Sequence, residues 1–164
     1  MATAAQRAHL HALATELYRH RGQLDYPPGD VRQAEDARDW TLTEQQAMVL
    51  LEHGGRMMFD CSEFCAWLLK CAGLWPFAQP GWTGSDLAAA VFPHYTDPRQ
   101  ALTGALVVFG RPPGHHMAMV YTPDPKGGNP VCVSHGRPGL DLQRLKVLEA
   151  RQPPGLVLLS IAHL

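Results

Sequence analysis

Apolar residues recur with helical spacing in the first part of the chain. A first amphipathic helix is expected over residues 3–20. Its apolar positions are Leu10, Leu13, Ala14 and Leu17. A second helix is expected from Thr41, which has capping-box spacing to Glu44, as far as His53. The first half of the chain is therefore predicted to be helical.

A third helix is expected over residues 61–72, and it carries the most informative chemistry. Asp60 is a strong N-cap type, and Glu63 stands three residues later, the spacing of a capping box. Apolar residues then follow with helical period: Phe64, Trp67, Leu68 and Cys71. Cys61 falls in the first turn, where unpaired N–H groups and the helix dipole stabilise an anion. We expect a thiol more acidic than free cysteine, and the thiolate is the nucleophilic form.

A structural role for Cys61 is the competing interpretation. Cys61 lies three residues before Phe64 and extends the apolar stripe, and buried inert cysteines are common. Cys65 also lies beside this stripe, but a full turn inside the helix. Position at the helix tip, behind a polar cap, is what distinguishes Cys61 as a candidate nucleophile.

The second half of the chain changes to short apolar runs separated by Pro and Gly turns. Four runs are expected to be strands: 105–109, 117–121, 131–134 and 156–161. A short helix is expected over residues 85–92. Helices first and strands after them predict an α+β fold, with helices packed on one antiparallel sheet.

The length, composition and net charge of the chain limit the classes of protein to which it can belong. The 164 residues, 46% of them hydrophobic and 18% charged, are expected to form one domain over residues 1–164. The net charge of -1 gives no reason to expect nucleic acid or an anionic membrane as a partner. No segment is suited to membrane insertion, and residues 1–22 lack the apolar core of a signal peptide, so we expect synthesis in the cytoplasm. The four cysteines have neither disulfide-framework nor zinc-site spacing.

Histidines downstream of Cys61 complete the layout of a cysteine hydrolase. His116 opens an expected strand, and we predict that its imidazole faces Cys61 Sγ, within or slightly beyond hydrogen-bond reach. His115 differs by one residue and therefore in facing. His135 closes the next strand, where it would lie beside His116 and orient it. The alternatives are solvent-exposed or turn histidines, and a zinc site, which the spacing does not favour.

These residues resemble the NlpC-type cell-wall peptidases, papain-like cysteine peptidases whose nucleophile helix begins with the pattern D-C-S-G-F. Residues 60–64, Asp-Cys-Ser-Glu-Phe, are similar to that pattern, and residues 104–109 resemble the family's G-D-L-V-F-F strand. The run that starts at His116 resembles the strand of the catalytic histidine, and His135 falls where the family has a third polar residue. Residues 60–64, 81–84 and 133–136 are similar to versions encoded by bacteriophages of actinobacteria, which occur as lysins or virion-associated peptidases.

The resemblance implies a papain-like NlpC-type fold with Cys61, His116 and His135 as the catalytic residues. The candidates for the substrate and oxyanion region are Tyr26, Asp60, Ser62, Glu63 and Trp82. Of these, Tyr26 is the candidate for a tyrosine that helps to line the oxyanion site. Glu63 stands where the family has Gly, and Ala105 where it has Asp.

A loop rich in Trp, Pro and Gly over residues 74–83 is expected to form one wall of the substrate groove. Its aromatic residues are Trp75, Phe77 and Trp82.

Together these features predict a cysteine endopeptidase that hydrolyses an amide bond in peptidoglycan stem peptides through a thioester, with no metal or organic cofactor. The expected partner is peptidoglycan, and delivery to the cell wall is expected to need a separate targeting partner or phage lysis. Two alternatives stay open. One is a catalytically silent structural or virion module of the same fold, and the other is an acyltransferase or deamidase with the same first half-reaction.

Overall fold

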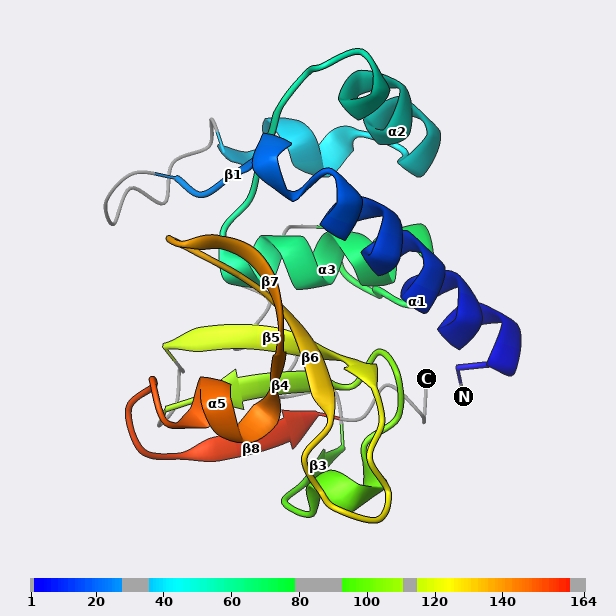
Figure 1. Ribbon diagram of the computed structural model, residues 1–164. Helices are drawn as coiled ribbons and strands as arrows, with labels where there is room; N and C mark the ends of the chain where they lie inside the picture. Colours follow the sequence, from blue (N-terminus) through cyan, green and yellow to red (C-terminus); the bar gives the residue numbers. More distant parts are fainter. Residues whose placement is uncertain (1, 28–35, 79–92, 111–114, 160–164) are drawn as a thin grey trace.

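Helices pack on a six-stranded antiparallel sheet in the computed structural model (Figure 1). The structure describes residues 2–27, 36–78, 93–110 and 115–159. The strand order is β3-β8-β4-β5-β6-β7, and every neighbouring pair is antiparallel. The expected α+β class is confirmed. No helix in these described ranges is long and apolar enough to cross a membrane.

The helices are α1 (Ala4–Arg19), α2 (Glu44–Glu52), α3 (Cys61–Cys71) and α5 (Leu145–Glu149), with 3₁₀ turns η1 (Arg21–Gln23), η2 (Asp36–Thr41) and η3 (Pro98–Gln100). The sheet strands are β3 (His94–Tyr95), β4 (Leu106–Phe109), β5 (His116–Thr122), β6 (Val131–Gly136), β7 (Gly139–Arg144) and β8 (Leu156–Leu159). A separate parallel pair joins β1 (Leu24–Asp25) to β2 (Met57–Met58).

Two of the expected helix starts are confirmed by their caps. Thr3 caps α1, and Asp60 caps α3 through the predicted capping box with Glu63. The capping box predicted between Thr41 and Glu44 is wrong. Thr43 caps α2 instead and Gln46 returns the bond, because Thr41 still belongs to the preceding turn η2.

The four expected strands are present as β4, β5, β6 and β8, with ends shifted by one or two residues; residues 160–161 of the last run lie outside the described residues. Strand β7 and helix α5 were missed. Their signal is present, since Leu140 and Leu142 alternate with polar residues directly after a Pro-Gly turn. The helix expected over residues 85–92 lies outside the described residues.

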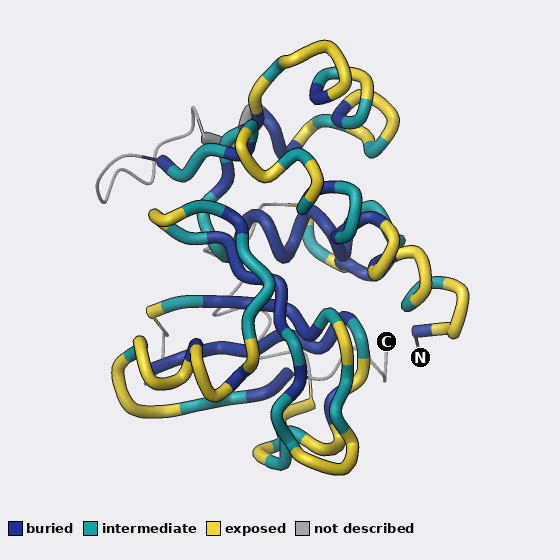
Figure 2. Tube along the Cα trace, in the orientation of Figure 1, coloured by how far each residue is buried: buried dark blue, intermediate teal, exposed yellow. Residues whose placement is uncertain are grey.

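The sheet separates two groups of buried apolar side chains. Figure 2 shows the buried residues in dark blue, many of them along α3 and the central strands. Successive residues of a strand point to opposite faces. Met117 therefore faces α3 and α1, while Ala118 faces the second group, which includes Phe109 of β4 and Leu148 of α5. The buried apolar side chains of β5 and β6 are divided between these two groups by this alternation.

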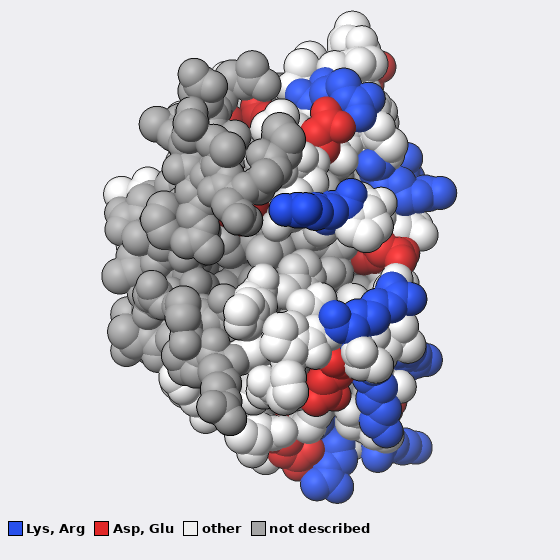
Figure 3. All heavy atoms as spheres, turned by 90° about the vertical axis from the view of Figure 1, so that its left-hand side faces the viewer, with Lys and Arg blue, Asp and Glu red and all other residues white. Residues whose placement is uncertain are grey.

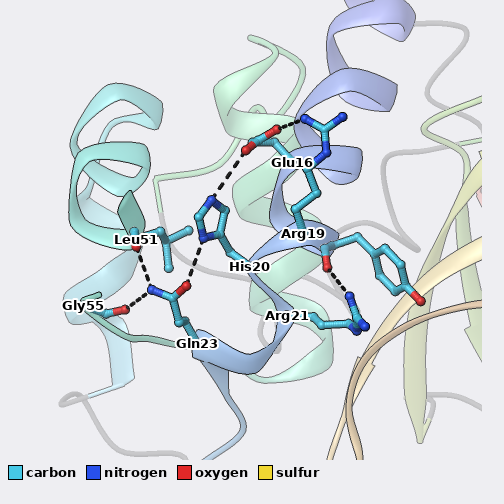
Figure 4. A network of polar contacts seen from close by, with 8 residues as sticks. Glu16, Arg19, His20, Arg21, Gln23, Leu51 and Gly55 are labelled. Atoms are coloured by element: carbon cyan, nitrogen blue, oxygen red, sulfur yellow. Dashed lines mark hydrogen bonds and ion pairs between the residues drawn. The ribbon is translucent and has the colours of Figure 1, made fainter. Parts of the chain in front are cut away.

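A polar network fixes the end of α1 against α2 (Figure 4). Gln23 Nε2 donates to the carbonyls of Leu51 at 2.7 Å and Gly55 at 2.8 Å. His20 Nδ1 lies 2.9 Å from Gln23 Oε1, and its other nitrogen lies 3.5 Å from a Glu16 carboxylate oxygen. Since Gln23 directly precedes β1, the network also sets where β1 and the residue after it, Tyr26, enter the molecule.

Candidate active site

Cys61 is the first residue of α3, directly behind its N-cap. One carboxylate oxygen of Asp60 accepts hydrogen bonds from the backbone N–H of Ser62 at 2.7 Å and of Glu63 at 2.8 Å, and from the Ser62 hydroxyl at 2.8 Å. The Glu63 carboxylate accepts from the Asp60 backbone N–H at 3.0 Å. Glu63, which stands where the resembled family has Gly, is therefore held in the cap. The Asp60 carboxylate thus accepts from the second and third backbone N–H groups of the helix. The Cys61 N–H is the first of the helix and is not one of these donors.

The thiol of Cys61 lies against two groups from distant parts of the chain. The hydroxyl of Tyr26, which directly follows β1, and the backbone N–H of Met117, the second residue of β5, lie close enough to the thiol to lower its pKa. The side chain is partly exposed. Tyr26, a candidate residue for the oxyanion region, is thus brought to the cysteine.

The expectation that the helix tip makes this thiol acidic is wrong for the protein at rest. Burial raises the pKa of Cys61 to about 11, and the Asp60 carboxylate adds to the rise. The Met117 N–H, the Tyr26 hydroxyl and the Ser62 N–H act in the opposite direction. Loss of hydration and a neighbouring negative charge outweigh the stabilisation from these donors, so the resting cysteine is a neutral thiol.

His116 is the first residue of β5, and its ring packs on the face away from the α3 core. It stacks on Phe109, its partner in β4, with ring centroids 5.9 Å apart. Its Nε2 lies 2.7 Å from Ser134 Oγ, while Nδ1 has no hydrogen bond to a described residue. Among the described side chains, no hydrogen bond joins His116 to Cys61, and the predicted approach of the two side chains stays a prediction. Burial, followed by repulsion from His135, lowers the pKa of His116 to about 4.

His135 lies on the other face of the hairpin, within the α3 side of the sheet, and is fully buried. Its Nε2 lies 3.0 Å from the backbone carbonyl of Asp25, and its ring contacts those of Tyr26 and Phe64. That carbonyl also accepts from the Phe59 N–H at 3.1 Å. His135 therefore joins β6 to the segment that carries Tyr26. The expectation that it lies beside and orients His116 is not met, because the two neighbouring strands pair Ala118 with Ser134.

Ser134 is the polar side chain beside His116 that the sequence analysis missed. The register that pairs Ala118 with Ser134 puts Ser134 on the face of His116 and turns His135 to the opposite one. The signal available in the sequence was the alternation within β6, where Cys132 and Ser134 share one face and Val133 and His135 share the other.

The remaining predicted residues have other surroundings. His115 is exposed and precedes β5. Trp75 and Phe77 pack on one another, with ring centroids 5.1 Å apart, and against the α3 side of the core. Trp82 lies outside the described residues. The four cysteines are free thiols, and in the described part of the chain no three His, Cys, Asp or Glu side chains are grouped to hold a metal ion.

The chain matches no protein-family model, and no curated protein matches it.

Proposed function

We propose that the chain is a papain-like, NlpC-type cysteine hydrolase that cleaves an amide bond in peptidoglycan stem peptides. The observation that carries the proposal is the meeting of three segments at the Cys61 thiol. A helix N-terminus, the Tyr26 hydroxyl and the backbone at the start of β5 converge there. His116 directly precedes Met117, so a base is next along the chain to the residue whose N–H interacts with the thiol.

In the proposed first step, the Cys61 sulfur attacks the scissile carbonyl carbon while its proton passes to Nδ1 of His116. The oxyanion that forms is stabilised by the Cys61 N–H and the Tyr26 hydroxyl. Collapse of the intermediate breaks the C–N bond, and the amine leaves with the proton from His116. Water, deprotonated by His116, then attacks the thioester, releases the acid and returns the proton to Cys61.

The resting arrangement requires one rearrangement for this chemistry. His116 is held at Nε2 by Ser134, and its ring turns about the end of β5 to bring Nδ1 to the thiol. Ser134 is suited to that role because a hydroxyl both donates and accepts. It can follow His116 between its neutral and charged forms. We therefore assign the orienting role to Ser134 rather than to His135.

The fold supports the same proposal in general terms. A cysteine at the N-terminus of α3, packed against a central antiparallel sheet whose strand β5 begins with a histidine, is the layout expected of the resembled family. In this proposal the substrate lies at the cell wall, and a separate partner or lysis brings the protein there.

Cell-wall digestion with two matched cysteine variants tests the proposal. Wild type and Cys71→Ala are expected to release peptide fragments from purified sacculi, while Cys61→Ala releases none. Cys71 is the matched control because it is also a partly exposed cysteine, at the other end of the same helix. Mass spectrometry of the fragments identifies the bond. Equal release by wild type and Cys61→Ala would remove Cys61 as the nucleophile.

A catalytically silent module of the same fold is the second candidate. It is favoured by the raised pKa of Cys61 and by the missing hydrogen bond between Cys61 and His116. Absence of fragments from sacculi of several peptidoglycan types, and from a synthetic stem peptide, would make this the better account.

A further inference from the structure

Tyr26 directly follows a strand that is too short to be fixed by backbone pairing alone. Strand β1 has two residues, and so has its parallel partner β2. Isolated two-stranded pairs are marginal in water, and parallel pairing is slightly weaker per residue than antiparallel pairing. The position of Tyr26 therefore depends on the side-chain contacts that hold the β1 segment.

Asp25, the last residue of β1, is held both at its backbone and at its carboxylate. Its carbonyl accepts from the Phe59 N–H at 3.1 Å and lies 3.0 Å from His135 Nε2. Its two carboxylate oxygens accept from Arg56, one from Nε at 2.7 Å and the other from a terminal nitrogen at 2.6 Å. Paired, charge-assisted hydrogen bonds of this kind fix geometry as well as charge. Arg56 thus holds the side chain of the residue that precedes Tyr26.

Most of the groups that hold the β1 segment come from residues 51–59, the stretch that leads to Cys61. Before β1, Gln23 donates to two carbonyls of this stretch (Figure 4). At β1 itself, the Arg56 side chain and the Phe59 N–H belong to the same stretch. One short segment therefore sets the place of the β1 segment and, through the chain, that of the nucleophile.

The pair of Arg56 and Asp25 differs from an ordinary surface ion pair in the length of chain that it spans. Its two side chains are 57% and 37% exposed. Figure 3, which views the side where β1 lies in Figure 1, shows basic and acidic side chains beside one another on this face. Arg99 and Asp97 form a similar forked pair, but they are two residues apart. Arg56 and Asp25 are 31 residues apart, so their pair joins two separate segments.

We propose that Arg56 is a positioning residue, which sets the Tyr26 hydroxyl beside the Cys61 sulfur through its forked ion pair with Asp25. The inference rests on the proposed hydrolase function and adds a residue outside the reacting groups. The Tyr26 hydroxyl lies close enough to the Cys61 thiol to lower its pKa, and in the proposed mechanism it stabilises the oxyanion. A donor to an oxyanion acts only where it is already in place. Loss of the pair should therefore slow the chemical step rather than weaken substrate binding.

Fluorine NMR of protein labelled with fluorotyrosine measures the position of Tyr26 without any substrate. The chain has four tyrosines, and the spectrum of Tyr26→Phe identifies the Tyr26 signal. Arg56→Gln is expected to shift or broaden this signal. Arg99→Gln, the matched control, should leave it as in wild type. A Tyr26 signal that is the same in wild type and Arg56→Gln would overturn the inference, whether or not wild type cleaves sacculi.

Kinetics on a synthetic stem peptide provide the second measurement. Arg56→Gln is expected to lower kcat about threefold to fivefold and to leave KM nearly unchanged, the size of effect that one well-oriented exposed ion pair allows. Arg56→Lys keeps the charge but loses the fork, so it should recover only part of the rate. Arg99→Gln should match wild type. A change confined to KM, or equal losses in Arg56→Gln and Arg99→Gln, would contradict the positioning role.

A double variant tests whether Arg56 acts through Tyr26. In a Tyr26→Phe protein, which lacks the hydroxyl, Arg56→Gln should cause no further loss of kcat, because both changes remove the same interaction. Losses that multiply in the double variant would overturn the inference. A displaced Tyr26 signal in Arg56→Gln, with no cleavage by wild type, would support Arg56 as the residue that places Tyr26 and would remove the hydrolase function instead.

Discussion

The two histidines of the β5–β6 hairpin have opposite environments. His116 lies on the face of Phe109 and bonds to Ser134, while His135 is sealed between Phe64 and Tyr26 and bonds to a backbone carbonyl. A carbonyl only accepts, so Nε2 of His135 carries the proton and its tautomer is fixed. A hydroxyl both donates and accepts, so His116 is free to change its protonation state. The two histidines therefore differ chiefly in their hydrogen-bond partners. The partner of His116 is compatible with a change of protonation state, and the partner of His135 is not.

Burial acts on both histidines in the same direction. It lowers the pKa of His116 to about 4 and also lowers that of His135. The difference lies in what protonation would cost. Nδ1 of His135 is buried and has no hydrogen-bond partner in the described structure, so a proton there would be an unsatisfied charge. His116 is partly exposed.

Of all the measurements, catalytic activity should differ most between variants of the two histidines. His116→Ala is expected to lower kcat by about a hundredfold to ten-thousandfold, the range for loss of a general base. His135→Ala should lower it less, because His135 acts through Tyr26. Rates on a synthetic stem peptide provide the measurement, with His115→Ala as a control. A larger loss in His135→Ala than in His116→Ala, at equal folded fraction, would transfer the role of base to His135.

For the free energy of unfolding we expect the opposite order, with the larger effect from the loss of His135. His135→Ala is expected to lower the free energy of unfolding by about 2–3 kcal/mol, because it leaves a cavity and removes the donor to the Asp25 carbonyl. His135→Gln should recover about 1 kcal/mol by restoring a donor. Exposed His115→Ala should change stability by less than about 0.5 kcal/mol. Urea unfolding of the three variants tests this. An unchanged midpoint for His135→Ala would remove its structural role.

Variants of Ser134, the hydrogen-bond partner of His116, test the same comparison. Ser134→Ala is expected to reduce kcat about tenfold, since it removes the hydrogen bond to Nε2 of His116. The substrate KM should stay nearly constant, and Ser134→Thr should recover part of the rate because its hydroxyl is retained. A loss confined to KM would place Ser134 in substrate binding instead.

The acid dependence of stability follows from both lowered pKa values. An unfolded histidine has a pKa near 6.5, above those of folded His116 and His135. Between these values the unfolded chain binds more protons, so the free energy of unfolding should fall as pH decreases from about 6.5 towards 4. Unfolded carboxyls titrate mainly below that window. Urea unfolding from pH 7.5 to 4 should show a smaller slope for His135→Gln than for wild type, and an equal slope would contradict burial of a neutral imidazole.

Alkylation gives the smallest expected effect. The pKa values of Cys71 and Cys132 are raised to about 12, and that of Cys61 to about 11. Cys61 should therefore react first with iodoacetamide, at a rate that rises with pH from 7 to 10. Peptide mapping after brief treatment measures the order. A rate already constant at pH 7 would reveal a thiolate–imidazolium pair, and faster labelling of Cys71 would contradict the assignment.

Local signals predicted the elements well. Helical spacing and caps predicted α1 and α3, and apolar runs between turns predicted β4, β5 and β6. These predictions succeed because each depends on residues a few positions apart. The start of α2 was wrong because neighbouring Thr residues offer competing caps, and the short turn η2 occupies the first of them. The candidate nucleophile was found for the same reason, as the residue behind a capping box.

The sequence by itself determined a helix that begins at Cys61, strands that carry His116 and His135, and the α+β order of helices before strands. Only the tertiary structure decided that Tyr26 meets Cys61, that Ser134 rather than His135 contacts His116, and that burial keeps the thiol neutral. The physical reason is that successive side chains of a pleated strand point to opposite faces of the sheet. A shift of one residue in the pairing of β5 with β6 moves a side chain to the other face of the sheet, and strand pairing over long separations sets that register.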